Sequence, residues 1–300
     1  MMTGQTATAR QVIREGTARL QAAGLLAPPM GTVEAGQAPR EAEWLLGRLM
    51  GMRPLDLYLD DRDVPGEVTA AFFSHIEARA SGAPLQYLLG EAEFCGESFA
   101  VAPGVFIPRP ETETVVEAAV DAWRAAARRL QRPLRVLDLG TGSGCLAVVV
   151  ARALPTCVVV GVELSWEALR IAKANVLRHG VSQRVRLVQG RWAEAIRGTW
   201  DGVISNPPYI PSAEVDGLPL DVRREPRVSL DGGTDGMHAL LQLLAEAPRL
   251  LAPRGVLVLE CGPLQVTRLI EAVRSAPWVE CVAALRDLAE RPRGLVITRS

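Results

Sequence analysis

The segment Ser205-Asn206-Pro207-Pro208-Tyr209-Ile210 follows an apolar run and combines a side-chain amide with two consecutive prolines and an aromatic ring. The prolines remove two N–H donors and restrict two φ angles, which fixes the directions of the backbone carbonyls. A planar nitrogen is a poor nucleophile because its lone pair is delocalised, and Asn206 Oδ1 and the Pro207 carbonyl can hold its two hydrogens. Tyr209 can stack on the planar group. The candidate catalytic and substrate-binding residues are therefore Asn206, Pro207, Pro208 and Tyr209, unless the segment is only a rigid turn.

A second pattern places glycine at alternate positions, where Gly140-Thr141-Gly142-Ser143-Gly144 follows the apolar residues 136–139. Glycine lets the backbone turn sharply and approach a ligand closely. Glu163 ends the next apolar run, where a carboxylate can accept hydrogen bonds from both hydroxyls of a ribose. The alternative for Glu163 is a solvated residue that caps the following helix.

The spacing of this loop distinguishes between cofactors. Nicotinamide dinucleotides are usually bound by G-x-G-x-x-G, whereas this chain has Asp138-x-Gly-x-Gly-x-Gly. The observed form resembles the cofactor loop of class I methyltransferases. We therefore expect S-adenosyl-L-methionine as the methyl donor, with S-adenosyl-L-homocysteine as its product.

Both patterns need a sheet that brings their loops to one edge. Apolar strands alternate with amphipathic helices after Pro110. The strands are predicted over residues 134–139, 157–163, 185–189, 200–205 and 255–260, and the helices over residues 111–130, 143–153, 166–179, 237–251 and 266–274. The alternation predicts an α/β fold with a mostly parallel, Rossmann-like sheet covered on both faces, whose ligands bind at the carboxyl ends of the strands.

The N-terminal part has a different pattern of apolar residues. Helical spacing predicts helices over residues 6–25, 39–51 and 67–80, with a loop rich in proline and glycine at 28–36. Short apolar runs punctuated by Gly96, Pro103 and Gly104 predict a connecting β-hairpin. We expect three parts: a helical domain at 1–88, a β-hairpin linker at 89–108 and a methyl-transfer domain at 109–300.

Composition excludes some functions. Lys+Arg total 33 against Asp+Glu 34, and the counts are 8 against 10 in residues 1–88 and 25 against 24 in residues 89–300. Neither part supplies the basic field that nucleic-acid phosphates require. The five cysteines form no CxxC pair and are expected to be buried hydrophobes, so no metal site is predicted. No apolar stretch is long enough to span a membrane, which indicates a cytoplasmic protein.

Further motifs, in order along most of the chain, resemble the release factor glutamine N5-methyltransferases of the PrmC/HemK family. The similar segments are Gly82-Ala83-Pro84-Leu85-Gln86-Tyr87, Ile107-Pro108-Arg109-Pro110-Glu111-Thr112-Glu113, Glu225-Pro226, Leu230-Asp231-Gly232-Gly233, Asp235-Gly236, Glu260, Gln265 and Asp287-Leu288.

This resemblance implies that the acceptor is the glutamine amide in the Gly-Gly-Gln tripeptide of class I peptide-chain release factors. It also implies that the helical domain helps to dock that protein substrate. Residues 140–144, Glu163 and Trp192 would hold the cofactor, with a contribution from Asn206, while residues 206–209 would grip the glutamine. No nucleic acid or membrane partner is expected, and a monomer is sufficient.

Two positions depart from the usual family pattern. Arg191 stands where many relatives have Asp, and it cannot accept a hydrogen bond from adenine. Glu163 replaces the commoner Asp.

The nearest alternative is a DNA adenine-N6 or ribosomal-RNA guanine-N2 methyltransferase, which would need a basic cleft. A nicotinamide-dependent oxidoreductase leaves the Asn206 loop unexplained, and a non-catalytic binding protein leaves both loops unexplained.

Overall fold

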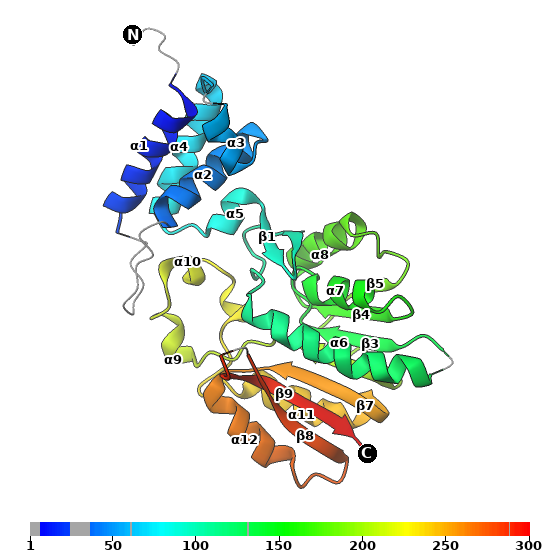
Figure 1. Cartoon of the computed structure of the whole chain (residues 1–300). Coiled ribbons are helices and arrows are strands. Elements are labelled where there is room, and N and C mark those ends of the chain that lie inside the picture. The colour runs from blue at the N-terminus through cyan, green and yellow to red at the C-terminus, as the bar shows by residue number, and fades with distance from the viewer. Residues whose placement is uncertain (1–6, 25–36, 61, 131, 288) are drawn as a thin grey trace. The chain divides into compact units, whose positions relative to one another are not determined.

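The computed structural model describes residues 7–24, 37–60, 62–130, 132–287 and 289–300. Its contacts divide the chain into two compact units (Figure 1). The helical unit comprises Met1–Gly90 and Leu218–Arg224, and the sheet unit comprises Glu91–Gly217 and Glu225–Ser300. The chain therefore enters the helical unit a second time after most of the sheet unit has been traced.

The helical unit packs short amphipathic helices around a core of its own. Its helices are α1 (Ala9–Ala22), α2 (Gln37–Met50), α3 (Pro54–Leu59), α4 (Gly66–Ala80), α5 (Leu85–Leu89) and the returning α10 (Leu220–Arg223). Leu45, Leu46, Phe72 and Ile76 are fully buried in this core. Three of these helices match the predicted ones, whereas Thr6, Leu25 and the loop predicted at 28–36 lie outside the described residues.

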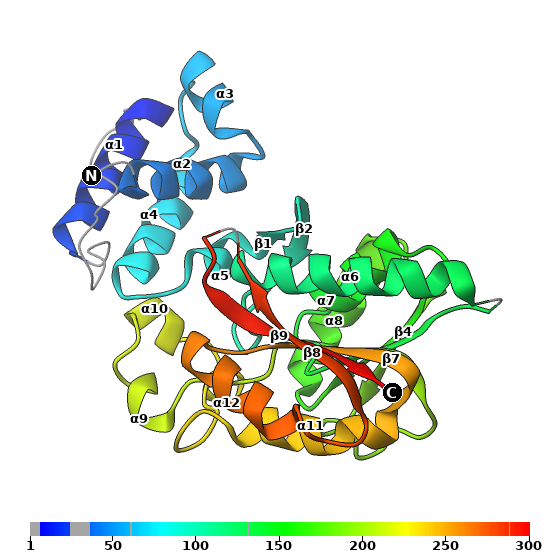
Figure 2. The same cartoon turned by 60° about the horizontal axis from the view of Figure 1, so that its bottom comes forward.

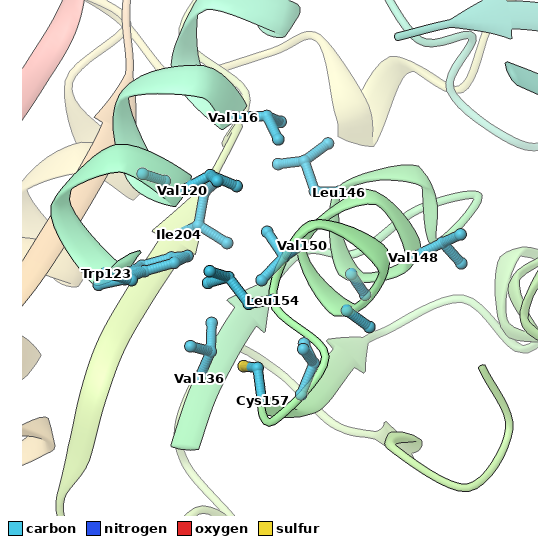
Figure 3. Close-up of a cluster of buried hydrophobic side chains, with 14 of the residues drawn as sticks. Val116, Val120, Trp123, Val136, Leu146, Val148, Val150, Leu154, Cys157 and Ile204 are labelled. Carbon is cyan, nitrogen blue, oxygen red and sulfur yellow. The ribbon is translucent and has the colours of Figure 1, made fainter. Parts of the chain in front are cut away.

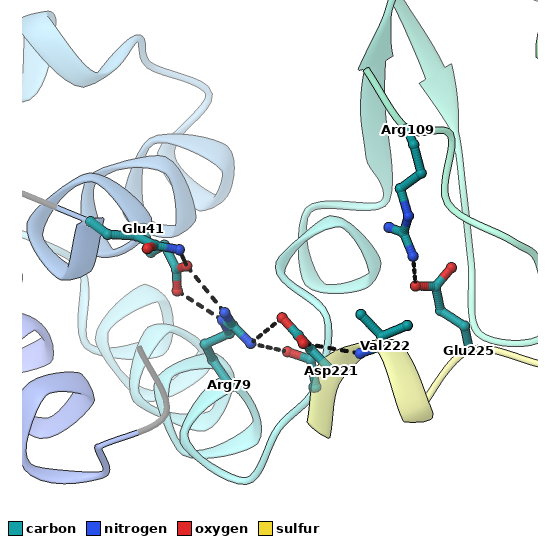
Figure 4. Close-up of polar contacts among 8 residues, drawn as sticks. Glu41, Arg79, Arg109, Asp221, Val222 and Glu225 are labelled. Atoms are coloured by element: carbon teal, nitrogen blue, oxygen red, sulfur yellow. Dashed lines mark hydrogen bonds and ion pairs between the residues drawn. The ribbon is translucent and has the colours of Figure 1, made fainter. Parts of the chain in front are cut away.

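One buried ion pair joins helices within this unit (Figure 4). Arg79 of α4 donates from Nε to Glu41 Oε2 of α2 at 2.8 Å, and both side chains are at most 6% exposed. Arg79 Nη1 also donates to the Ala83 carbonyl at 3.1 Å and lies 3.5 Å from Asp221 Oδ2 in α10. The segment Leu218–Arg224 is thereby tied to the helical unit through a buried charge.

The sheet unit begins with the predicted hairpin, β1 (Glu91–Phe94) and β2 (Glu97–Ala100), which pair antiparallel. Cys95 N donates to Glu113 Oε1 at 2.8 Å, and Asn175 donates to the carbonyls of both Ala100 and Ser143. The hairpin is therefore fixed to the sheet unit and to the glycine loop.

A seven-stranded sheet follows, in the order β5-β4-β3-β6-β7-β9-β8 (Figures 1 and 2). The strands from β5 to β7 are parallel, and β9 pairs antiparallel with both β7 and β8. The strands are β3 (Arg135–Leu139), β4 (Val158–Glu163), β5 (Val185–Gln189), β6 (Trp200–Ser205), β7 (Leu251–Glu260), β8 (Val279–Arg286) and β9 (Pro292–Arg299). The prediction of a mostly parallel Rossmann-like sheet is confirmed.

Helices cover both faces of this sheet, which explains the continuous apolar strands. Neighbouring residues of one strand belong to opposite cores: Ile204 packs with α6, α7 and α8, while Val203 packs with α11 and α12. Figure 3 shows the first of these cores. The long helices are α6 (Glu111–Arg129), α7 (Cys145–Ala153), α8 (Trp166–Arg178), α11 (His238–Leu250) and α12 (Pro263–Val273), and the short ones are α9 (Ser212–Val215) and the 3-10 turn Arg227–Ser229.

Helix ends follow the local sequence. Ser165 caps α8 by accepting from Ala168 N at 3.2 Å. Gln265 at the third position of α12 accepts from Gly262 N at 2.8 Å, and Pro263 occupies the first position, where no N–H is needed. Glu111 and Glu113 lie in the first turn of α6, where the helix dipole favours negative charge.

Three further observations bear on the sequence-based expectations. No helix in the described ranges is both long and apolar enough to cross a membrane. Those same ranges contain no cluster of three His, Cys, Asp or Glu residues suited to a metal ion. Cys145, Cys157 and Cys261 are buried as expected, but Cys95 is only partly buried, and Cys281 is exposed because it lies on β8, the edge strand.

Candidate active site

A cavity of about 780 Å³ lies where the carboxyl ends of β3, β4 and β6 meet. Its walls include most of the residues singled out from the sequence, together with parts of the segments that precede α6 and α11. The lining residues used below are Phe106, Thr112, Gly140, Thr141, Gly142, Ser143, Glu163, Glu167, Arg191, Trp192, Asn206, Pro208, Asp231 and His238. Gly144, Pro207 and Tyr209 adjoin these residues in sequence but do not line the cavity.

Hydrogen bonds to Asp138, a buried residue of β3, stabilise the conformation of the glycine loop. Gly140, Gly142 and Gly144 have φ angles of 76°, 54° and 80°, in the left-handed region that favours glycine. Asp138 Oδ2 accepts from the Thr141 hydroxyl and from Ala147 N, which ties the loop and the first turn of α7 to the strand. Complete burial raises the pKa of Asp138 to about 7 against these two hydrogen bonds.

Glu163 connects the glycine loop to the start of α8. Its Oε2 accepts from Gly142 N and its Oε1 accepts from Ser165 N, both at 2.9 Å. Ser165, not Glu163, caps the helix, so the alternative reading of Glu163 as a helix cap is wrong. Each carboxylate oxygen has further acceptor capacity, and the side chain lines the cavity, so it can also hold ribose hydroxyls.

Trp192 lies beside the glycine loop. Its backbone has a φ of 46°, which is strained for a residue with a side chain. A methyl group at Gly140 would lie 3.3 Å from the Trp192 ring, so glycine gives this ring its place beside the loop. Arg191 is exposed and also lines the cavity.

Asn206 directly follows β6 and lines the same cavity as the glycine loop. Ser205 donates to the Leu139 carbonyl at 2.5 Å, which joins the ends of β6 and β3. Asn206 Nδ2 donates to Thr112 Oγ1 at 3.1 Å. Among the described residues, nothing donates to Asn206 Oδ1 or to the Pro207 carbonyl. Asn206 lines the cavity, so its Oδ1 is available to a bound group, whereas Pro207 is buried and does not line the cavity.

Tyr209 does not line the cavity and is held through its side chain and its backbone. Its hydroxyl donates to Glu260 Oε1 at 3.2 Å, and its carbonyl accepts from Gln265 Nε2 at 2.8 Å. A methyl group at Gly232 would come within 2.7 Å of Tyr209 Cα, and one at Gly236 within 2.2 Å of its carbonyl oxygen. These contacts fix the loop, while stacking of the ring on a substrate stays a prediction.

Two motifs that the sequence placed only by resemblance meet beside the cavity. Glu225 accepts from Ile107 N at 2.9 Å and forms an ion pair with Arg109 (Figure 4). The contact joins the segment before α6 to the segment that follows α10. Sequence reasoning missed the hydrogen bonds of Thr112 and Glu260, although both residues lie in segments quoted for the family resemblance.

The fold is that of class I methyltransferases. The catalytic domain of hMettl16, in complex with the MAT2A 3′UTR hairpin 6, superposes with a TM-score of 0.53 at 15% identity over 80% of this chain and 85% of that one. At this identity the likeness concerns the fold alone. The Methyltransferase small domain model matches residues 122–217, and the PrmC N-terminal domain model matches residues 11–90.

Curated relatives then narrow the class. Two proteins named release factor glutamine methyltransferase are 40% identical over 81% of this chain and 84% of the Geobacter sulfurreducens protein, and 38% identical over 95% of this chain and 96% of the Moorella thermoacetica protein. A third, from Nitratidesulfovibrio vulgaris, is 36% identical over 98% of this chain and 96% of its own length. The chain belongs to the release factor glutamine methyltransferase family. It is an S-adenosylmethionine-dependent methyltransferase, as the glycine loop predicts.

Proposed function

We propose that this enzyme transfers a methyl group from S-adenosyl-L-methionine to the side-chain amide nitrogen, N5, of the glutamine in the Gly-Gly-Gln tripeptide of class I peptide-chain release factors. The observation that carries the proposal is that Asn206 and the glycine loop line one cavity. The names of the full-length relatives support the choice of substrate.

The residues around the cavity fit the methyl donor. Glu163 offers carboxylate oxygens for the ribose, the loop 140–144 leaves room for close backbone approach, and Trp192 offers an apolar face. When bound, S-adenosylmethionine supplies an electrophilic methyl group on a sulfonium. The uncharged amide of glutamine then needs orientation more than a strong base.

The chain's own acceptors provide that orientation. Asn206 Oδ1 and the Pro207 carbonyl hold the two N5 hydrogens, which directs the nitrogen lone pair toward the donor and polarises both N–H bonds. Pro207 and Pro208 keep the carbonyls in fixed directions. The extra proton on N5 leaves after the methyl group has arrived, so no residue has to abstract it first.

Charge around the cavity favours a protein substrate over a nucleic acid. Its lining includes three carboxylates, Glu163, Glu167 and Asp231, and one guanidinium, Arg191. Phosphates would be repelled by such a lining, whereas a glutamine side chain carries no charge. We therefore place the DNA adenine and ribosomal-RNA guanine alternatives second. We further propose that residues 1–88 dock the release factor and that the enzyme acts as a cytoplasmic monomer.

A direct test incubates the enzyme with labelled S-adenosylmethionine and purified release factor, either wild type or with the Gly-Gly-Gln glutamine changed to alanine. Label should enter only the wild-type factor, and equal labelling of both would reject the proposed acceptor. Asn206→Ala should lower the rate by about 10²-fold or more, because a preorganised polar contact to the reacting group is lost. Turnover close to that of the wild-type enzyme would remove Asn206 from the mechanism.

A further inference from the structure

A chain of buried polar groups lies behind Asn206 and is not used by the chemistry described so far. Thr112, in the first turn of α6, is 1% exposed and accepts from Asn206 Nδ2 at 3.1 Å. Glu260, the last residue of β7, is 3% exposed and accepts from the Tyr209 hydroxyl at 3.2 Å. Two of the residues in the 206–209 segment are thus held by buried groups from two different elements.

The contact with Thr112 decides which end of the Asn206 amide faces the cavity. An asparagine side chain carries one acceptor oxygen and one donor NH₂ group. With Nδ2 turned to Thr112, Oδ1 is left for the hydrogens of the acceptor nitrogen. A half-turn of the amide would instead present N–H groups to N–H groups, and the substrate amide would not be held.

The surroundings of Thr112 favour its role as an acceptor. A threonine hydroxyl has one hydrogen to donate and two lone pairs. The hydroxyls of Thr112 and Tyr209 both stabilise the ionised Glu260 carboxylate and lower its pKa, against a larger rise to about 7 caused by burial. Oε1 takes the Tyr209 hydrogen bond, whereas Oε2 has no hydrogen-bond partner of ordinary geometry among the described residues. A Thr112 hydrogen directed to this carboxylate leaves a lone pair for Asn206.

We propose that Thr112 is a positioning residue for methyl transfer: its hydroxyl, backed by the buried carboxyl group of Glu260, orients the Asn206 amide so that Oδ1 faces the acceptor nitrogen. The inference rests on the proposed function, because it is the glutamine amide that needs an acceptor at this point. Thr112 itself touches no reacting atom in this scheme.

The experiment compares Thr112→Val, which keeps the shape and removes the hydroxyl, with Thr112→Ser, which keeps the hydroxyl. Thr114→Val makes the same change two residues further along α6 and serves as the matched control. Initial rates are measured with saturating labelled S-adenosylmethionine and release factor, and cofactor affinity is measured separately by calorimetry.

We expect Thr112→Val to lower kcat by about 10-fold, the loss of one hydrogen bond of ordinary strength, with cofactor affinity unchanged. Thr112→Ser should restore most of the rate, and Thr114→Val should match the wild-type enzyme. Equal losses in the Val and Ser variants would assign Thr112 to packing and overturn the proposal, as would a wild-type rate in Thr112→Val. If the Val variant does not fold, Thr112→Ala removes the same hydroxyl and takes its place in the comparison.

A double-mutant cycle adds a measurement that a structural role would not satisfy. In the Asn206→Ala background no amide remains to be oriented, so Thr112→Val should change the residual rate by no more than about twofold. A full loss in that background would contradict the proposal. Failure of the wild-type enzyme and of Thr114→Val to methylate release factor would instead overturn the proposed function, which keeps the two results apart.

Discussion

Three carboxylates near the cavity have different surroundings and therefore different tasks. Asp138 and Glu260 are buried, and desolvation raises the pKa of each to about 7. Glu163 is only partly buried and accepts from two backbone N–H groups. Asp138 and Glu260 stabilise loops through buried hydrogen bonds, whereas Glu163 lines the cavity and can contact a ligand.

For Glu163, we expect the Ala variant to bind S-adenosylmethionine at least about 10-fold more weakly, because hydrogen bonds to a charged group are lost. Titration calorimetry measures the affinity directly. Glu194→Ala removes an exposed carboxylate outside the cavity lining and should leave the affinity unchanged. Unaltered binding by the Glu163 variant would reject its assignment to the ribose.

The raised pKa of Glu260 predicts a pH dependence of the rate. The ionised carboxylate is the stronger acceptor for the Tyr209 hydroxyl and is further stabilised by the hydroxyl of Thr112, so kcat should rise as the pH passes through about 7. Glu111 raises this pKa and Arg293 lowers it, and both lie among its charged neighbours. Since burial favours the protonated form, ionisation costs folding free energy over the same range, and stability should fall as the pH rises from the unfolded value toward 7.

Glu260→Gln tests this dependence because it keeps the size of the side chain and removes the titration. The variant should be slower than wild type at pH 8, and its kcat should no longer rise as the pH passes through 7. Burial also raises the pKa of Asp138 to about 7. A pH dependence near 7 that persists unchanged in Glu260→Gln would therefore assign it to Asp138 and contradict the role of Glu260.

At the scale of elements, the packing of α6 on the sheet depends on one small residue. Trp123 of α6 is fully buried against β6, and a methyl group on Gly202 would come within 2.3 Å of its ring (Figure 3 shows Trp123). The strand residue next to the ring therefore has to be glycine for the helix to lie this close.

We expect Gly202→Ala to destabilise the protein by about 1–3 kcal/mol, since overpacking forces the ring or the strand to move. Urea denaturation measures the change. Gly66→Ala is the control, because its methyl group meets no atom within 4 Å, and it should shift stability by no more than about 1 kcal/mol. A Gly202 variant as stable as this control would show that the core can rearrange at no cost.

Much of the sheet unit follows from sequence patterns, and the exceptions have physical reasons. The apolar runs of β3 to β7 and the long helices between them are visible because both faces of the sheet are covered. β8 and β9 were not predicted, since β8 is a half-exposed edge strand and no helix separates it from β9. α3, α9 and α10 have six residues or fewer, too short to show a helical period.

The candidate site was predictable to a similar degree. The glycine loop and the Asn206 segment are recognisable because each follows a strand and their backbone chemistry depends on residue type. The orientation of Tyr209 toward Glu260 was not predictable, because β7 and β6 become neighbours only in the folded sheet. The same holds for Thr112, which reaches Asn206 across 94 residues of sequence.

At the scale of the whole molecule, the stability of the helical unit depends on the buried Arg79–Glu41 ion pair. Arg79→Leu should destabilise this unit by about 3–5 kcal/mol, because Glu41 is left as a buried charge without its cation. Hydrogen exchange of the α2 and α4 amides measures the loss, and Arg14→Leu on the exposed face of α1 is the control.

Replacing both partners separates charge from packing. The double variant Arg79→Leu with Glu41→Leu should lose less stability than Arg79→Leu alone, since no unpaired charge remains. A double variant that is the less stable of the two would show that the pair stabilises the unit by its own attraction. Cofactor affinity should stay at the wild-type value in each variant, because the cavity lies in the sheet unit.

The return of the chain to the helical unit has a consequence for the order in which the protein is made. Helices α1 to α5 leave the ribosome early, but Leu220, which covers Gly82, and Asp221, which faces Arg79, are synthesised after most of the sheet unit. At about 5–20 residues per second the early helices wait on the order of ten seconds for α10. The N-terminal part of this enzyme is therefore among the last to reach its complete fold, and a fragment that ends near Gly90 would carry Arg79 without one of its carboxylates.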